Sequence, residues 1–454
     1  MQLAIRNSQP FYVPFYDATA NGHTSPARGW NSFGIQANSG TQKTAGWDFN
    51  DYHFAQQCDL MVTQPGYDYV CSIDSGWSTT GGDQNGRIVE NTTVFSTYGS
   101  LKGFGDHLHS QGLKLGVYLL PGAVTSDGDK TIENTQIQLK DVFDTSQPGY
   151  FARTTFLWGK DGVQQWHDSE IRYLEAQGVD FVKLDFVTPG SIDSNPLPAD
   201  NSQSVNNADS LRLDTDVNNA DGGGQITFVA WQTVQRAIER YRSFINQQTE
   251  DSSRQGHGIM IRPDMDSTYI GNPQSLSGIS DVQRYSMAIH WIGAGANLIT
   301  GSDQTTRDSL GYELMYNEEA MTIADFTSQW PMQPRNPSGW GTAGAGASMQ
   351  LQAWIAGPNE QGTAVAVLAN YGPDLGQGGF NTNWTDTHLV SIQLSDLGIG
   401  PGMQYGGNSW SVRRVWGGGG SGGGNHQDIG TTSDKIESWL GEGESVLYKL
   451  QKQS

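Results

Sequence analysis

The stretch GVDFVKLDF, residues 178–186, is a short run of β-branched and aromatic residues that ends in Lys183 and Asp185. Such a run is typical of a buried strand. The segment before it, residues 168–178, is apolar at helical spacing and stops at a glycine. The sequence therefore predicts a helix followed by a strand, with charged side chains at the carboxyl end of the strand.

Six further apolar runs have the same character, and amphipathic helical patterns at residues 97–112, 228–248 and 279–296 lie among them. Strands that alternate with helices over residues 29–303 indicate repeated βα units. We therefore expect a (β/α)8 TIM barrel, in which the chemistry lies at the carboxyl ends of the strands. The predicted strands end at Trp30, Asp74, Tyr118, Asp185, Arg212, Arg262 and Thr300.

This count leaves the barrel one βα unit short. The connection from Asp185 to Arg212 is rich in Pro, Asn, Asp and Ser and contains no apolar run for a strand and a helix. We expect either that the 454-residue sequence lacks a segment between about Ser191 and Asn206, or that the barrel is unusual.

The pattern changes near residue 335 to alternating apolar and polar residues, which predicts an antiparallel β-sandwich domain. The expected domains are a barrel at 1–335 and a C-terminal antiparallel β domain at 336–454. Residues 417–424, GGGGSGGG, are typical both of an engineered loop replacement and of a natural hairpin tip. The predicted strands lie within residues 351–358, 363–372, 389–398, 411–416 and 445–450.

The amino-acid composition excludes several classes of function. A net charge of −21 repels nucleic-acid phosphates and anionic membrane surfaces, so nucleic acid is excluded as a partner. No stretch approaches eighteen consecutive apolar residues, so we expect no membrane span. Few charged residues, 58 glycines and many aromatic residues are common in secreted proteins whose aromatic surfaces suit carbohydrate ligands.

We expect a secreted glycoprotein, because sequons occur at Asn91 and Asn383. The first residues contain no apolar signal-peptide core, so a secreted protein would appear here in mature or recombinant form. Cys58 and Cys71 permit at most one disulfide, and we expect buried thiols.

Acidic residues recur at or just beyond the predicted strand ends, at Asp74, Asp185, Asp216 and Asp264. A barrel would bring them to one mouth, and paired carboxylates there suit glycoside hydrolysis. The sequence contains neither a glycine-rich phosphate loop nor a His/Cys cluster, so no metal and no cofactor is expected. His107 and His109 lie on a predicted helix and are interpreted as structural.

Five ordered segments resemble glycoside hydrolase family 27, the melibiase or α-galactosidase family, of which the chain looks like a divergent member. They are RGWNSF (28–33), GYDYVCSIDSGW (66–77), HSQGLKLGVY (109–118), GVDFVKLDF (178–186) and the segment 261–303. The resemblance implies a retaining exo-glycosidase that acts on a carbohydrate with a terminal α-D-galactosyl or related unit.

The family motif Lys-x-Asp falls on Lys183 and Asp185, which implies Asp185 as the nucleophile and Lys183 as a ligand of sugar hydroxyls. Two residues apart on a strand, they share a face, and the lysine charge helps to keep the carboxylate ionised. Trp30 would form an apolar wall under the sugar, and Asp74, Trp77 and Tyr118 would complete the clamp.

The second catalytic motif of the family resembles LRLDTDV, residues 211–217, which implies Asp216 as acid/base and Arg212 on substrate hydroxyls. Arg262 and Asp266 are also four residues apart and compete for this assignment. We prefer Asp216, because a helical pattern follows it, and Asp264 then fits a supporting carboxylate.

Departures from the family affect the substrate more than the chemistry. Where galactosidases carry two consecutive acids, this chain has Asp74 and Ser75, and the cysteines that border the family's sugar pocket are absent. Two alternatives therefore stand beside α-galactosidase activity: a β-L-arabinopyranosidase, and a carbohydrate-binding relative without turnover.

Overall fold

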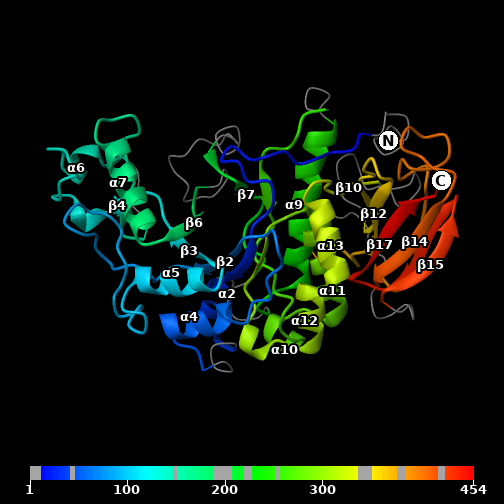
Figure 1. Cartoon of the computed structure of the whole chain (residues 1–454), viewed down its shortest axis with the longest axis horizontal. Coiled ribbons are helices and arrows are strands. Elements are labelled where there is room, and N and C mark those ends of the chain that lie inside the picture. The colour runs from blue at the N-terminus through cyan, green and yellow to red at the C-terminus, as the bar shows by residue number, and fades with distance from the viewer. Residues whose placement is uncertain are drawn as a thin grey trace. The chain divides into compact units, whose positions relative to one another are not determined.

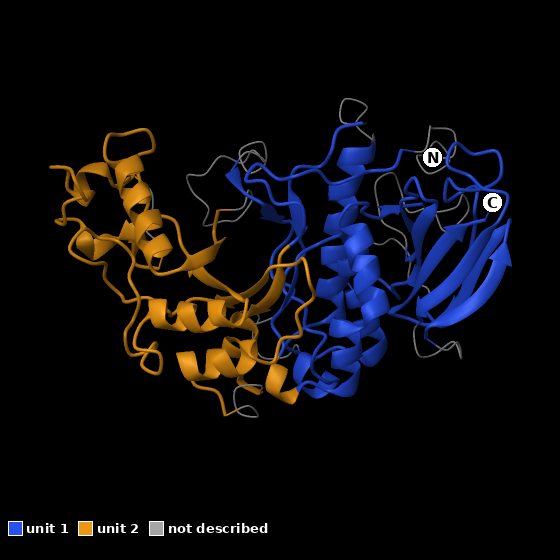
Figure 2. Cartoon of the chain, in the orientation of Figure 1, with its two compact units in different colours: residues 1–26, 204–302, 307–454 blue, residues 27–203, 303–306 orange. Residues whose placement is uncertain are grey.

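A computed structural model of the chain describes residues 12–40, 46–146, 151–187, 207–218, 227–250, 256–335, 350–375, 385–417 and 425–453. Contacts divide the chain into two compact units (Figure 2). Unit 2 comprises residues 27–203 and 303–306, and unit 1 comprises residues 1–26, 204–302 and 307–454. The predicted domain boundary between residues 335 and 336 lies within unit 1 and stays a prediction.

Four adjacent parallel strands lie in unit 2 (Figure 1), and each ends within one residue of its predicted position. The strands are β1 (Arg28–Asn31), β2 (Tyr69–Ile73), β3 (Lys114–Leu119) and β6 (Val179–Leu184), in the order β6-β3-β2-β1. Close pairing explains Gly29, because a Cβ there would overlap the carbonyl oxygen of Val70 on β2.

Short helices and a pair of short antiparallel strands complete unit 2. Two predicted helical patterns, at residues 97–112 and 168–178, are confirmed as α5 and α7. The paired strands β4 and β5 were not predicted, because two-residue strands carry no periodicity. The elements are α2 (Phe33–Gln36), α4 (Asp51–Cys58), α5 (Leu101–Ser110), β4 (Ala123–Val124), α6 (Leu139–Val142), β5 (Arg153–Thr154) and α7 (Val163–Ala176).

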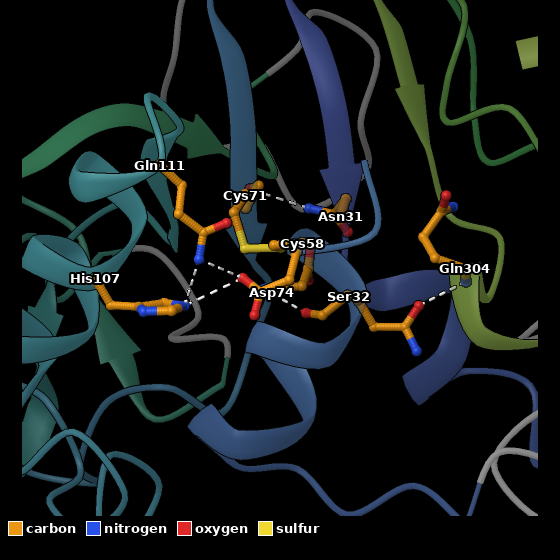
Figure 3. Close-up of a disulfide and its surroundings, with 11 residues drawn as sticks. Asn31, Ser32, Cys58, Cys71, Asp74, His107, Gln111 and Gln304 are labelled. Atoms are coloured by element: carbon orange, nitrogen blue, oxygen red, sulfur yellow. Dashed lines mark hydrogen bonds and ion pairs between the residues drawn. A yellow bond between two sulfur atoms is a disulfide. The ribbon is translucent and has the colours of Figure 1, made fainter. Parts of the chain in front are cut away.

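The expectation of buried free thiols is wrong, because Cys58 and Cys71 form a disulfide (Figure 3). Both residues are buried, and their Cα atoms lie 5.8 Å apart. The end of α4 packs against β2 and brings the two sulfur atoms within bonding distance, which a sequence separation of 13 residues does not reveal. On α5, the interpretation of His107 and His109 as structural is supported by their contacts with Asp59 and Asp180.

A buried carboxyl group, Glu170 on α7, lies outside the predicted site. Its Oε2 accepts a hydrogen bond of 2.7 Å from the backbone N–H of Ile88, and its Oε1 has no hydrogen-bond partner among the described residues. Burial raises the pKa of Glu170 to about 7, although the Ile88 N–H and the charge of Arg153 oppose the rise. The folded protein therefore favours the protonated side chain.

We expect the protonated Glu170 to stabilise the fold fully below about pH 4.5, its ordinary pKa. This stabilisation is lost as the pH rises to about 7, and amounts to about 3 kcal/mol. Glu170→Gln keeps a neutral side chain of the same shape, so its free energy of unfolding should lack this decline. Urea unfolding at pH 4.5 and 7.5 measures the difference.

The control for this experiment is Glu175→Gln, which changes an exposed carboxylate on the same helix. It should show the same decline as the wild type. A constant difference between wild type and Glu170→Gln at both pH values would contradict the prediction.

Unit 1 contains the remaining three predicted barrel strands, and two of them, β7 and β8, pair in parallel. β8 begins at Arg262, where we predict it to end. The predicted helices at residues 228–248 and 279–296 are confirmed as α9 and α11. The elements are β7 (Ser210–Arg212), α9 (Trp231–Glu250), β8 (Arg262–Asp264), α10 (Gln274–Ser277), α11 (Asp281–Ala294), β9 (Leu298–Thr300), α12 (Ser309–Tyr316) and α13 (Glu318–Thr327).

The C-terminal part of unit 1 is antiparallel, as predicted (Figure 1). Six strands form one sheet in the order β10-β11-β12-β17-β14-β15, and β13 pairs with β16 in a second sheet. All five predicted strands are present. The bounds are β10 (Gln333–Pro334), β11 (Leu351–Ala356), β12 (Thr363–Asn370), β13 (His388–Gln393), β14 (Trp410–Trp416), β15 (Gln427–Thr432), β16 (Lys435–Leu440) and β17 (Glu444–Lys452).

The strands β11 and β12 of the larger sheet are buried on both faces, which explains why they are almost continuously apolar. On one face Trp354 and Val367 share a core with residues of α9 and α11. On the other face Ile355 and Leu368 share a core with Val390 of the β13-β16 sheet. The fold thus joins a layer of helices to a sheet-on-sheet packing within one unit.

Three predictions concern segments that lie partly or wholly outside the described residues. They are the missing βα unit between about Ser191 and Asn206, the origin of residues 417–424, and the sequon at Asn383. Residue 417 ends the described part of the β14 segment, and β15 follows from residue 427. Within the described ranges, no helix has both the length and the apolar character needed to cross a membrane.

Candidate active site

The carboxyl ends of β2 and β6 bring Asp74 and Lys183 together in unit 2. Lys183 Nζ lies 2.8 Å from Asp74 Oδ2, and the Asp74 side chain is only 2% exposed. The backbone N–H of Asp74 donates to the buried hydroxyl of Ser32, 2.8 Å away (Figure 3). A carboxylate that is almost completely buried needs a charged partner, so the ion pair with Asp74 fixes the ammonium group of Lys183 at the strand ends.

Both carboxylate oxygens of Asp185 accept hydrogen bonds. The hydroxyl of Tyr118 on β3 donates to Oδ2 and the backbone N–H of Phe186 donates to Oδ1, each at 2.9 Å. Lys183 Nζ lies 5.5 Å from the centroid of the Tyr118 ring. The structure therefore brings together Asp74, Tyr118, Lys183 and Asp185. Within this group, Lys183 forms its ion pair with Asp74.

The predicted aromatic contacts of unit 2 differ in exposure. Trp30 and Trp77 are buried in the hydrophobic core, and the indole N–H of Trp77 donates to the carbonyl oxygen of Tyr118 at 2.7 Å. Their predicted contact with a sugar stays a prediction that their burial does not support. Ser75 is exposed, and its backbone N–H donates to Asp74 Oδ1 at 2.9 Å.

In unit 1, Arg212 at the end of β7 is surrounded by three carboxylates. Its guanidinium group lies 2.7 Å from Asp266, 3.2 Å from Asp216 and 3.6 Å from Asp264. Burial disfavours the charge of Arg212, but the carboxylates outweigh burial and raise its pKa. The parallel pairing of β7 and β8 creates this cluster, because it sets Arg212 opposite Asp264.

Asp266 is a member of this cluster that we predicted only as part of a rival motif. It is 5% exposed at its side chain, and its backbone has a positive φ of 78°. Burial raises its pKa to about 6, with Arg212 opposing the rise and Asp216 adding to it. Arg262, the other member of that motif, donates to the carbonyl oxygens of Ser328 and Thr24.

The two acids of residues 211–217 point to different partners. Asp214 lies 2.5 Å from Nε of Arg236 on α9, and its side chain is 7% exposed. Asp216 pairs with Arg212 and keeps 47% of its side chain exposed. Asp214 therefore anchors the segment, whereas Asp216 is open to a ligand.

In the part of the chain that the structure describes, no group of three His, Cys, Asp or Glu side chains could hold a metal ion. Carboxylates, a lysine and an aromatic hydroxyl at the carboxyl ends of parallel strands are typical of enzymes that cleave glycosidic bonds. The site therefore falls in the class of glycoside hydrolases.

Comparison with known proteins agrees with this class. A family model described as alpha galactosidase A matches residues 26–144. "Alpha-galactosidase 3" of Hypocrea jecorina is 38% identical over 480 aligned positions, which cover 96% of this chain and 72% of the relative. "Putative alpha-galactosidase 8" of Emericella nidulans is 32% identical, over 82% of this chain and 79% of the relative.

Among solved structures, a family 27 β-L-arabinopyranosidase from Geobacillus stearothermophilus superposes with a TM-score of 0.70 at 17% identity. The match covers 94% of this chain and 96% of that one. The 480 positions aligned with the Hypocrea relative exceed the 454 residues of this chain, so that relative contains residues that this chain lacks. The chain belongs to glycoside hydrolase family 27, the α-galactosidase family.

Proposed function

We propose that the protein is a secreted, retaining exo-glycosidase that releases terminal α-D-galactosyl units from oligosaccharides or polysaccharide side chains. Hydrolysis of terminal α-galactosides is supported by the curated relatives, which are named as α-galactosidases. The observation that carries the mechanism is the fixed carboxylate of Asp185, held at both oxygens beside the Lys183–Asp74 pair.

Asp185 acts as the nucleophile. Its carboxylate attacks the anomeric carbon and forms a covalent glycosyl-enzyme as the leaving oxygen departs. The two hydrogen bonds to Asp185 restrict its rotation, so the carboxylate needs little reorganisation before attack. The ammonium group of Lys183 and the carboxylate of Asp74 bind hydroxyl groups of the same sugar.

Asp216 acts as the acid/base. It protonates the leaving oxygen in the first step and accepts a proton from water in the second step, when water displaces Asp185 from the sugar. Asp266 is the rival, because a pKa of about 6 suits a proton donor. Its oxygens accept from Arg212 and from the backbone N–H of Val217, and its side chain is buried, so we assign it to positioning.

Two broader features belong to the same proposal. A closed (β/α)8 barrel is supported by the parallel strands and by the fold of the solved relatives. Secretion is supported by the Cys58–Cys71 disulfide, since disulfides persist in oxidising compartments, and by the sequon at Asn91. Residue Asn91 itself is partly exposed.

Proton NMR of the first product formed from an α-D-galactoside tests the mechanism. We expect α-galactose to appear first and to mutarotate later, because two displacements at the anomeric carbon restore its configuration. β-Galactose as the first product would rule out the covalent intermediate.

A β-L-arabinopyranosidase is the second candidate, and Ser75 is the observation that favours it. An arabinopyranosyl unit resembles galactose without the C6 hydroxymethyl group, so it needs one clamp group fewer than galactose. The ratio of kcat/KM for p-nitrophenyl α-D-galactopyranoside and β-L-arabinopyranoside separates the two candidates. Binding of either sugar without turnover of any glycoside would favour a binding relative instead.

A further inference from the structure

In unit 2 the side chains of Phe151 and Phe186 are in contact, and the backbone is strained at both residues. Phe151, Ala152 and Phe186 have positive φ angles of 49°, 58° and 55°. Residues with a Cβ atom avoid this left-handed region, because the Cβ approaches the following carbonyl oxygen. The rings of Phe151 and Phe186 lie 5.1 Å apart between centroids, with 49° between their planes. Such strain persists only where the surrounding structure holds it.

The side of Phe151 is anchored by the antiparallel pair of β4 and β5, of which β4 begins four residues after β3 ends. Ala123 pairs with Thr154, and the backbone N–H of Thr125 donates to the carbonyl oxygen of Ala152 at 2.8 Å. Backbone hydrogen bonds on both strands thus fix the residue next to Phe151. Phe151 as a residue is 64% exposed, so its contact with Phe186 is not a by-product of core packing.

The side of Phe186 leads directly to the proposed nucleophile. The backbone N–H of Phe186 donates to Asp185 Oδ1 at 2.9 Å, and the backbone N–H of Asp185 donates to the carbonyl oxygen of Leu119 at 3.1 Å. The left-handed conformation at Phe186 aims its N–H back at the preceding carboxylate. A relaxed φ at Phe186 would turn this N–H away from Asp185.

We infer that Phe151 is a positioning residue for Asp185 and acts through Phe186. This inference rests on the proposed role of Asp185 as nucleophile. The Phe151 ring holds Phe186 in its left-handed conformation, and the Phe186 N–H then holds the ionised carboxylate in place for attack. Other polar and charged groups at the same strand ends are the Tyr118 hydroxyl, which donates to Oδ2, and the Lys183–Asp74 pair.

The experiment compares Phe151→Ala with wild type on p-nitrophenyl α-D-galactopyranoside. We expect kcat to fall on the order of tenfold with KM nearly unchanged, because a hydrogen bond to a charged group is weakened. The split between the two constants is the diagnostic readout, because a purely structural role would not lower kcat selectively.

Two further variants make the result specific. Trp158→Ala removes the ring of another exposed aromatic residue of unit 2, which stacks on His167, and should leave kcat and KM unchanged. Phe186→Asn keeps the N–H in a residue that adopts the left-handed region more readily. In that background Phe151→Ala should change kcat by no more than about twofold, since the support is no longer needed.

An unchanged kcat in Phe151→Ala, a change in KM as large as the change in kcat, or the same loss in both backgrounds would overturn the inference. Phe151→Leu keeps an apolar side chain of similar size and replaces Phe151→Ala in the experiment if the alanine variant does not fold. The same results would support or overturn the inference. The proposed function is tested separately, by turnover and retention in the wild type. A wild type that retains configuration while Phe151→Ala behaves normally refutes only the positioning role.

Discussion

Asp185→Gly should reduce kcat/KM for aryl α-galactosides by on the order of 10⁴-fold, while the protein keeps its fold. The carboxylate that attacks the anomeric carbon is removed, and the cavity left by its side chain admits a small anion. Azide should therefore restore turnover by attacking the substrate directly. A single displacement inverts the configuration, so the product should be β-galactosyl azide, identified by NMR.

The matched control for this variant is Asp180→Asn on the same strand. Asp180 contacts His109 and accepts from the backbone N–H of Leu115, 2.9 Å away, and has no assigned part in the site. Asparagine keeps an acceptor for that N–H, so activity should stay within about twofold of wild type. Undiminished hydrolysis by Asp185→Gly would remove Asp185 from the mechanism.

Asp216→Gly should lower kcat/KM for oligosaccharides such as raffinose by about 10²- to 10⁴-fold, the usual contribution of a general acid. Dinitrophenyl galactosides should still react in the first step, because dinitrophenolate leaves without a proton. The glycosyl-enzyme should then accumulate as a burst of released dinitrophenolate.

Azide distinguishes the two carboxylates. In Asp216→Gly, azide should attack the glycosyl-enzyme on Asp185, and the second displacement should give α-galactosyl azide. Asp214→Asn is the control within the same segment, since Asp214 pairs with Arg236, and it should keep the pH profile of the wild type. A β-azide from Asp216→Gly would exchange the assigned roles, and no effect would reopen the choice of Asp266.

The prediction of strands succeeded where local pattern and tertiary environment agree. Buried strands of a parallel sheet must be apolar along most of their length, so β2 and β3 were visible as short apolar runs. The boundary of β8 was misplaced, because Pro263 and charged residues interrupt the pattern at that point. The paired strands β4 and β5 were not predicted, because each contains only two residues.

The sequence predicted most residues of the site but few of the contacts between them. The spacing of Lys183 and Asp185 indicated a shared face, but the ion pair to Asp74 depends on β2 and β6 lying two strands apart in the sheet. Asp266 and Phe186 have positive φ angles, which no sequence pattern predicts. The place of each residue in the site therefore depends on backbone conformation as well as on residue type.

The amino-acid sequence by itself determined which segments form βα units and which acids stand at their ends, because helical and strand periodicities are local properties of the chain. Only the tertiary structure decided which side chains meet. Some of these contacts join residues that are distant in sequence, and others depend on backbone geometry. Examples are the Cys58–Cys71 disulfide, the carboxylates around Arg212 and the contact between Phe151 and Phe186. Such contacts depend on how elements pack, and local pattern carries no record of packing.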